Sequence, residues 1–250
     1  MDVRVQGAVP AAPFLSARDL FETEYDLDKR VDVQVREDPD ERTWTAHYDD
    51  RHVLNISRKA ATGAMARELA LHEFAHMRRN EGDHPSHTQS TREALFLALA
   101  GHSVEKHKIA HCYQIANHMK DIYADDITLH VGPSDKLVSF LESSLAGAVR
   151  DRPGDVPGGW HRHTGGTDPE ITAVNAAFAL ALVERHDLVA DDHRIYDLAH
   201  AAASDAPGVD FEGFRTRFRD LAEGPSESTY RSALVDATRE YATDGGRAAD

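Results

Sequence analysis

The chain has 250 residues, 41% of them hydrophobic, and a formal net charge of −15 at pH 7. This length and composition suit a folded protein with a sizeable core and exclude a disordered chain. The acidic balance argues against a nucleic acid or an anionic membrane as partner, because binding to either draws its strength from clustered Lys and Arg. We therefore expect no nucleic acid and no membrane among the partners.

The basic residues and the single cysteine indicate the habitat of the organism and the cellular compartment of the protein. Only six of the 28 basic residues are lysine, and an acidic, lysine-poor surface is typical of proteins from salt-loving archaea. Cys112 is the only cysteine, so neither an internal disulfide nor a zinc site of several cysteines can form. The sequence has no apolar signal segment and no run of about 18 apolar residues. We expect a soluble, cytoplasmic protein of a halophilic archaeon.

The N-terminal part is predicted to be a helix followed by a small sheet. Ser16 and Asp19 favour the start of a helix that ends near Asp28. After it the hydrophobic period changes to two, so that Val31 and Val33 alternate with polar residues. Three strands are expected, at residues 31–36, 44–48 and 52–57. Their close succession predicts an antiparallel sheet.

Helical spacing dominates the rest of the sequence. A helix that starts at Thr62 or Gly63 is expected to end before Gly82. Further helices are expected at residues 91–100, 104–126 and 135–149. The whole pattern, with a few strands first and many helices after them, predicts the α+β class.

Two domains follow from this pattern. Residues 151–166 are rich in Gly and Pro and predict a linker. Before it, residues 1–150 are expected to form a domain in which the short antiparallel sheet precedes the helices. After it, residues 167–250 are expected to form a helical extension of four amphipathic helices, the first of which starts at Asp168-Pro169-Glu170.

The segment His72-Glu73-Phe74-Ala75-His76 carries the strongest chemical signal. On a helix, His72 and His76 lie on one face with their imidazoles about 6 Å apart, close enough to share a tetrahedral Zn²⁺. Both continue an apolar stripe that starts with Met65 and Leu69, so we expect them to be buried and to need a partner. Glu73 can reach a water molecule on the metal and remove a proton from it as a general base.

A helix with this HExxH motif after an antiparallel sheet resembles the active-site region of the zincin superfamily of metallopeptidases. The resemblance implies a zinc-dependent hydrolase that cleaves peptide bonds in a peptide or protein substrate. It also implies that the last strand before the helix, residues 52–57, borders the substrate cleft and holds the peptide by strand addition.

The third metal ligand is expected from a later helix. The segment Asp121-Ile122-Tyr123-Ala124-Asp125 resembles the ExxAD element of the gluzincin peptidases that are related to membrane-bound prenyl-protein and heat-shock proteases. In that element the first acid binds zinc and the last one orients a ligand histidine, which implies these roles for Asp121 and Asp125. The sequence departs from the element by having Asp121 in place of Glu, and it shows no membrane helices.

Three other residues are alternative third ligands. His84 and His87 follow the motif closely, as in another zincin group, but the HExxHxxGxxH pattern of that group needs a histidine at Gly82. Glu93 lies 17 residues after His76, yet Leu97 stands where that spacing pattern has Asp. The sequence therefore favours Asp121 and leaves His84, His87 and Glu93 open.

A second function is compatible with the same residues. The chain could be a zincin-derived protein-binding module that keeps its metal for stability without catalysis. Glu73 argues for the hydrolase, because a purely structural zinc site needs no general base and usually has all four ligand positions filled by the protein.

Overall fold

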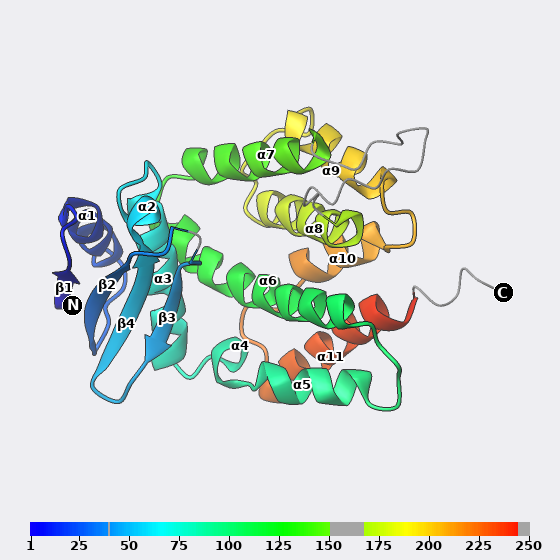
Figure 1. Ribbon diagram of the computed structural model, residues 1–250, viewed down its shortest axis with the longest axis horizontal. Coiled ribbons are helices and arrows are strands. Elements are labelled where there is room, and N and C mark those ends of the chain that lie inside the picture. Colours follow the sequence, from blue (N-terminus) through cyan, green and yellow to red (C-terminus); the bar gives the residue numbers. More distant parts are fainter. Residues whose placement is uncertain (40, 151–167, 245–250) are drawn as a thin grey trace. The chain divides into compact units, whose positions relative to one another are not determined.

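The computed structural model describes residues 1–39, 41–150 and 168–244, which have an α+β structure (Figure 1). The predicted linker, residues 151–166, lies outside the described residues. Contacts divide the chain into two compact units: the first comprises Met1–Gln89 and Lys120–Lys136, and the second comprises Ser90–Met119 and Leu137–Asp250. This division differs from the predicted boundary, because residues 90–119 and 137–150 pack with the C-terminal helices instead of with the sheet.

The first unit contains a four-stranded sheet in the order β1-β2-β4-β3. The strands are β1 (Val3–Gln6), β2 (Arg30–Arg36), β3 (Trp44–His47) and β4 (Arg51–Ser57). β1 pairs with β2 and β2 pairs with β4 in parallel, and only β3 pairs with β4 in the antiparallel direction. The prediction of an antiparallel sheet is therefore wrong for two of the three strand pairs, and β1 was not predicted.

The burial of the strands explains this order. Every residue of β4 from His52 to Ser57 is buried, and a strand that is covered on both faces suits an interior place in a sheet. β3 is shorter and exposes Trp44 and His47, as is common for an edge strand. β2 and β3 are consecutive strands along the chain, yet β3 pairs with β4 and not with β2.

Helices α1 and α3 pack on one face of this sheet. α1 (Ala12–Phe21) starts earlier than predicted, with a proline in its first turn in place of a cap from Ser16. α3 (Ala66–Glu81) ends at Gly82 as predicted, but it starts later, because a separate short helix α2 (Arg58–Ala61) follows β4. The short helix α4 (Pro85–Thr88) comes next.

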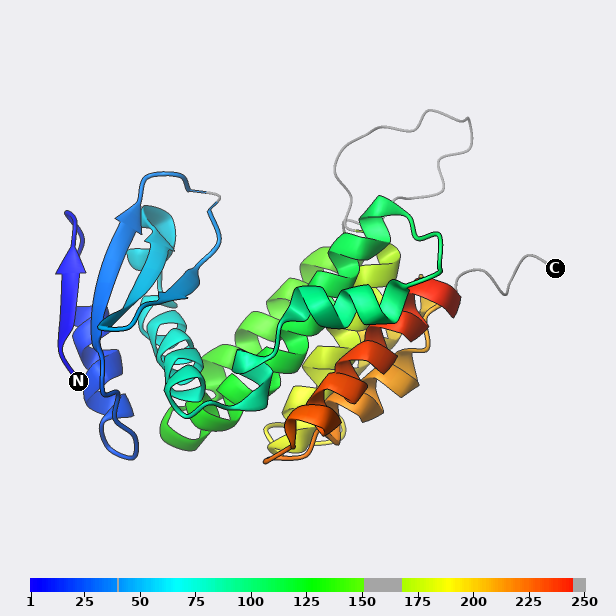
Figure 2. The same cartoon turned by 90° about the horizontal axis from the view of Figure 1, so that it is seen from below.

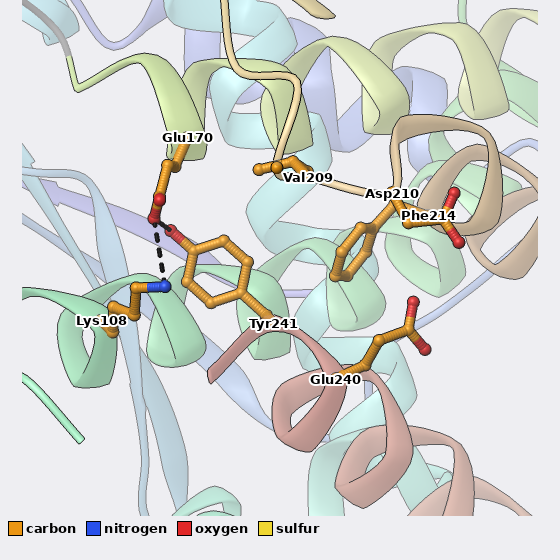
Figure 3. Close-up of a pocket in the computed structure, with 8 residues that line it drawn as sticks. Lys108, Glu170, Val209, Asp210, Phe214, Glu240 and Tyr241 are labelled. Carbon is orange, nitrogen blue, oxygen red and sulfur yellow. Dashed lines mark hydrogen bonds and ion pairs between the residues drawn. The ribbon is translucent and has the colours of Figure 1, made fainter. Parts of the chain in front are cut away.

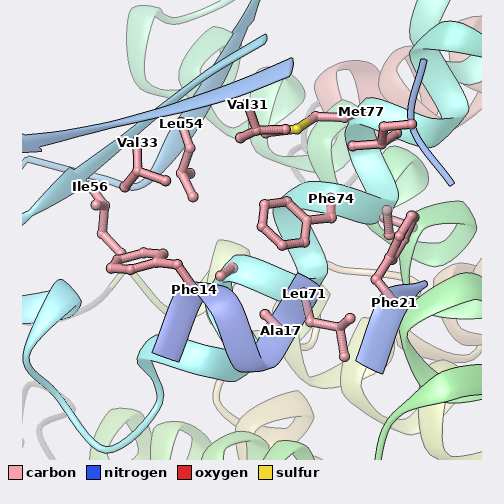
Figure 4. Close-up of a cluster of buried hydrophobic side chains, with 14 of the residues drawn as sticks. Phe14, Ala17, Phe21, Val31, Val33, Leu54, Ile56, Leu71, Phe74 and Met77 are labelled. Atoms are coloured by element: carbon pink, nitrogen blue, oxygen red, sulfur yellow. The ribbon is translucent and has the colours of Figure 1, made fainter. Parts of the chain in front are cut away.

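The core of the first unit fixes the orientation of α3. Figure 4 shows Leu54 and Ile56 of the sheet facing Phe14 of α1, with Phe74 and Leu71 of α3 in the same cluster. All five side chains are at most 3% exposed. The core-facing side of α3 is therefore not the predicted stripe of Met65, Leu69, His72 and His76, which are only partly buried. The two histidines lie beside the core.

The second unit consists of helices in its described part. It contains α5 (Thr91–Leu99), nearly all of α7 (Asp135–Arg150), α8 (Pro169–Arg185), α9 (Arg194–Ser204), α10 (Phe211–Arg219) and α11 (Glu227–Asp244). α8 starts at the predicted Asp168 cap, but it is not amphipathic: nearly all residues from Ile171 to Val183 are buried. A helix that is apolar on all sides belongs inside a core, and α8 contacts both α9 and α10.

One long helix contributes to both units. α6 (Lys106–Val131) has 26 residues and appears in Figure 2 as a continuous helix. Its residues up to Met119 belong to the second unit, and those from Lys120 belong to the first. Among the described residues, no helix is both long enough and apolar enough to cross a membrane.

Replacing Phe14 with Ala should destabilise the first unit. Phe14 is fully buried between α1 and the sheet, and truncating such a side chain leaves a cavity that costs about 3 to 5 kcal/mol. Denaturant unfolding followed by circular dichroism measures this loss. Phe96→Ala is the control, because Phe96 is 74% exposed and its truncation should change stability by no more than about 0.5 kcal/mol. Equal effects of the two variants would contradict the assignment of this core.

Candidate metal centre

Two histidines of α3 and one aspartate of α6 converge within the first unit. Their possible ligand atoms all lie within 4.8 Å of one another. The Nε2 atoms of His72 and His76 are 3.0 Å apart, and Oδ1 of Asp121 lies 3.4 Å from His76 Nε2 and 3.8 Å from His72 Nε2. The structure thus brings together the three residues that the sequence proposed as metal ligands.

The Nδ1 atom of each histidine is held by another side chain. His72 Nδ1 lies 2.8 Å from Oδ1 of Asp125, which is buried one turn after Asp121 on α6. His76 Nδ1 lies 2.7 Å from His87 Nε2, and His87 Nδ1 lies 2.7 Å from Ser86 Oγ. A metal-bound histidine usually donates its second N–H to such a partner, which fixes the ring and its tautomer.

The geometry and the donor set fit a zinc ion. Two atoms bonded at about 2.0 to 2.2 Å to one tetrahedral ion lie about 3.3 to 3.6 Å apart. One of the three distances here, 3.4 Å, lies in this range, and the other two, 3.0 and 3.8 Å, lie just below and just above it. When the Nδ1 atoms of His72 and His76 donate, both Nε2 atoms present lone pairs to each other. Such lone pairs repel unless a proton or a metal ion lies between them. Two imidazoles and one carboxylate suit Zn²⁺ better than Mg²⁺ or Ca²⁺.

The electrostatics of the site favour a positive charge. Burial lowers the pKa of His72, but the carboxylates of Asp125 and Asp121, and more weakly Glu73, outweigh burial and raise this pKa to about 10. In the metal-free chain, a proton on His72 therefore supplies the positive charge. Burial, followed by the neighbouring His76, lowers the pKa of His87 to about 2, so His87 is neutral and can accept the Nδ1–H of His76.

Glu73 lies beside the three ligand residues and is not one of them. Its side chain is buried, and its Oε2 accepts a hydrogen bond of 2.5 Å from Thr45 Oγ1 on β3. Its charge contributes to the raised pKa of His72, after the larger contributions of Asp125 and Asp121. A carboxylate near the metal position but not bound to it is placed to exchange protons with a water molecule there.

The alternative third ligands do not join this group. His87 contacts His76 on the Nδ1 side, away from the converging Nε2 atoms. His84 caps α4, with its Nδ1 on Ser86, and packs on the ring of Tyr123. Glu93 is exposed on α5, in the second unit.

The strand predicted to hold a peptide is the wrong one. β4, which corresponds to residues 52–57, is hydrogen-bonded to β2 on one side and to β3 on the other. It therefore has no free edge for strand addition. β3 is the edge strand of the sheet, and its Thr45 contacts Glu73.

Sequence reasoning missed a chain of hydrogen bonds that runs from α3 to β3. His52 is fully buried, and its Nε2 lies 3.0 Å from Oε1 of Glu81, the last residue of α3. His52 Nδ1 lies 2.8 Å from Nδ1 of His47. Burial, then His52 and His76, lower the pKa of His47 to about 4. A histidine inside the apolar strand 52–57 was the one signal of this arrangement in the sequence.

A second group of possible ligands lies in the second unit. Ligand atoms of His111, Asp168 and Glu170 lie within 4.8 Å of one another. Figure 3 shows Lys108 and Tyr241 both reaching the carboxylate of Glu170, with Nζ and Oη at 3.6 and 3.3 Å. The ammonium group of Lys108 thus lies against one of the three residues of this group.

Replacing Asp125 with Asn should weaken zinc binding. The change keeps the shape of the side chain but removes the charge that orients His72, and loss of such a partner costs about 10- to 100-fold in metal affinity. Competition with a fluorescent zinc chelator measures the affinity. The matched control is Asp126→Asn, which removes one carboxylate charge at the neighbouring position. The charge of Asp126 acts on Arg79. If both variants bind zinc like the wild type, Asp125 does not support the site.

Comparison with known proteins adds a family but no activity. Residues 1–243 match the model of a family of unknown function, DUF5781. No curated protein and no solved structure matches the chain. Because the family match covers nearly the whole chain, including every residue of the candidate metal centre, the chain belongs to the DUF5781 family.

Proposed function

We propose that the chain is a zinc-dependent hydrolase that cleaves peptide bonds. One observation carries the proposal: the ligand atoms of His72, His76 and Asp121 converge at distances that suit one tetrahedral ion. Three protein ligands leave a fourth position open, as in catalytic zinc sites and unlike structural ones. The buried carboxylate of Glu73 beside the ligands adds a group that can transfer protons.

Each residue has a distinct role in the proposed reaction. His72, His76 and Asp121 would hold the ion, with Asp125 and His87 fixing the two imidazoles. A bound Zn²⁺ would supply a Lewis acid that polarises the substrate carbonyl and activates a water molecule near neutral pH. The carboxylate of Glu73 would take a proton from that water molecule and give it to the leaving amine.

The edge of the sheet supports a peptide as the substrate. β3 lies at the edge, and its Thr45 donates a hydrogen bond to Glu73. An extended peptide that adds to an exposed strand gains main-chain hydrogen bonds, and side-chain pockets then give specificity. A peptide paired with β3 would thus run close to the carboxylate that acts as the base.

The alternative, a metal-containing binding module without catalysis, is less well supported. Such a module needs no acid or base beside its ion. Glu73 is nevertheless buried, which is costly for a carboxylate unless it has partners, and here it keeps a hydrogen bond to Thr45. A role in proton transfer accounts for this placement.

Purified protein should bind about one zinc ion per chain, because three protein ligands converge in the first unit. Elemental analysis after dialysis measures the stoichiometry. His72→Ala should lose the ion, since it removes one of the converging Nε2 atoms. His193→Ala is the control, because His193 caps α9 in the second unit. A wild-type chain that stays free of metal after zinc addition would overturn the proposal.

Glu73→Gln should abolish hydrolysis while preserving zinc binding. The amide has nearly the same size but cannot accept the proton of the water molecule, and losing a general base costs about 10²- to 10⁴-fold in rate. Cleavage of unfolded casein at high salt, with and without a chelator, measures the activity. Glu24→Gln, at an exposed position, is the control and should act like the wild type. Wild-type turnover in Glu73→Gln would show that Glu73 is not the base, and a zinc-loaded wild type without activity would favour the binding module.

A further inference from the structure

A chain of hydrogen bonds connects a buried acid and a buried histidine to an exposed histidine at the edge of the sheet. Glu81 is 3% exposed at its side chain and His52 is 0% exposed, whereas His47 is an exposed residue of β3. The imidazoles of His47 and His52 meet edge to face, with ring centroids 4.9 Å apart. Two buried polar side chains, Glu81 and His52, thus orient the exposed side chain of His47.

The hydrogen bonds define which nitrogen of each ring carries the proton. Glu81 accepts backbone N–H groups from Asp28 and Lys29, both at 2.9 Å, and its carboxylate oxygens are acceptors, so the contact of 3.0 Å to His52 Nε2 has His52 as the donor. Burial lowers the pKa of His52 although Glu81 opposes this, so His52 is neutral and its Nδ1 is an acceptor. Nδ1 of His47 must then donate, which leaves a lone pair on Nε2 of His47.

His47 lies on the side of β3 that faces the candidate metal centre. Alternate residues of a strand share one face, so His47 points to the same side as Thr45, whose hydroxyl contacts Glu73. His47 also pairs directly with His52 across β3 and β4. His76 is close enough to His47 to lower its pKa. No other hydrogen-bond partner of His47 than His52 occurs among the described residues.

We propose that His47 is a positioning residue of this site, held by His52 and Glu81 as a neutral acceptor that binds an amide N–H of the peptide substrate through Nε2. The inference rests on the proposed function and deepens it. A lone pair at this position attracts N–H donors and repels carbonyl and carboxylate oxygens. His47 therefore selects the substrate and its alignment along β3, and it is not among the residues whose ligand atoms converge with those of His72, His76 and Asp121.

The tautomer can be tested on the metal-free chain. Nitrogen-15 NMR of histidine-labelled protein distinguishes a protonated ring nitrogen from one with a lone pair. The His47 signals, assigned by their loss in His47→Phe, should show Nδ1 protonated and Nε2 unprotonated at neutral pH. A proton on Nε2 instead would overturn the proposal, whatever the chain catalyses.

Two variants of the exposed residue test the role in binding. His47→Phe removes the acceptor, and loss of one hydrogen bond should lower kcat/KM about tenfold, mainly through KM. His47→Gln can present its carbonyl oxygen near the place of Nε2 and should recover most of this loss. Zinc affinity should be unchanged in both variants. The measurements are peptide hydrolysis on the zinc-loaded full chain and the zinc titration described above.

The outcomes separate this inference from the proposed function. A wild type that binds zinc and cleaves peptide, together with a His47→Phe variant of equal kcat/KM, would overturn the role of His47 alone. A fall in zinc affinity in His47→Phe would overturn it too, because His47 would then be a ligand. A wild type that binds no zinc or cleaves no peptide would overturn the proposed function, and the role of His47 with it.

Discussion

The burial of one side of α3 determines how the rest of the candidate site is arranged. Phe74 and Leu71 pack against the sheet and α1, and together with Met77 they fix the rotation of the helix about its axis. With that rotation set, His72 and His76 emerge beside the core and meet the aspartates of α6. The apolar contacts thus do not form the site, but they decide which helix the histidines face.

Three histidines around the site share one arrangement. His72, His76 and His47 each have Nδ1 engaged by a partner: a carboxylate, a histidine, and a histidine that a carboxylate orients. In each ring, Nε2 is therefore the nitrogen that points away from this partner. The partners come from α6, α4 and β4, so three different elements set the protonation pattern of one cluster. The chain has a net charge of −15, but this total does not show that the buried carboxylates of Asp125 and Glu81 orient individual histidines.

The sequence predicted the local features of the site and missed the non-local ones. The spacing of His72 and His76 depends only on the helical repeat, and a motif resemblance linked Asp121 and Asp125 to them. The order of the strands depends on pairing between residues that are distant in the sequence. The strands follow one another closely along the chain, which led to the prediction of antiparallel hairpins, but β2 and β4 pair in parallel. The chain from Glu81 to His47 joins three elements, so no spacing rule could have predicted it.

The path of α6 has a consequence for how the protein can be divided. The first unit is built from two separate stretches, and Lys120–Lys136 returns to it after the chain has contributed α5 and about half of α6 to the second unit. A fragment that stops at Gln89 would keep the HExxH segment but lack Asp121 and Asp125. The first unit is therefore not one contiguous segment of the sequence, and truncation or gene fusion at that point would separate His72 and His76 from Asp121 and Asp125. The residues of the candidate metal centre come from two stretches of the chain, which residues 90–119 of the second unit connect.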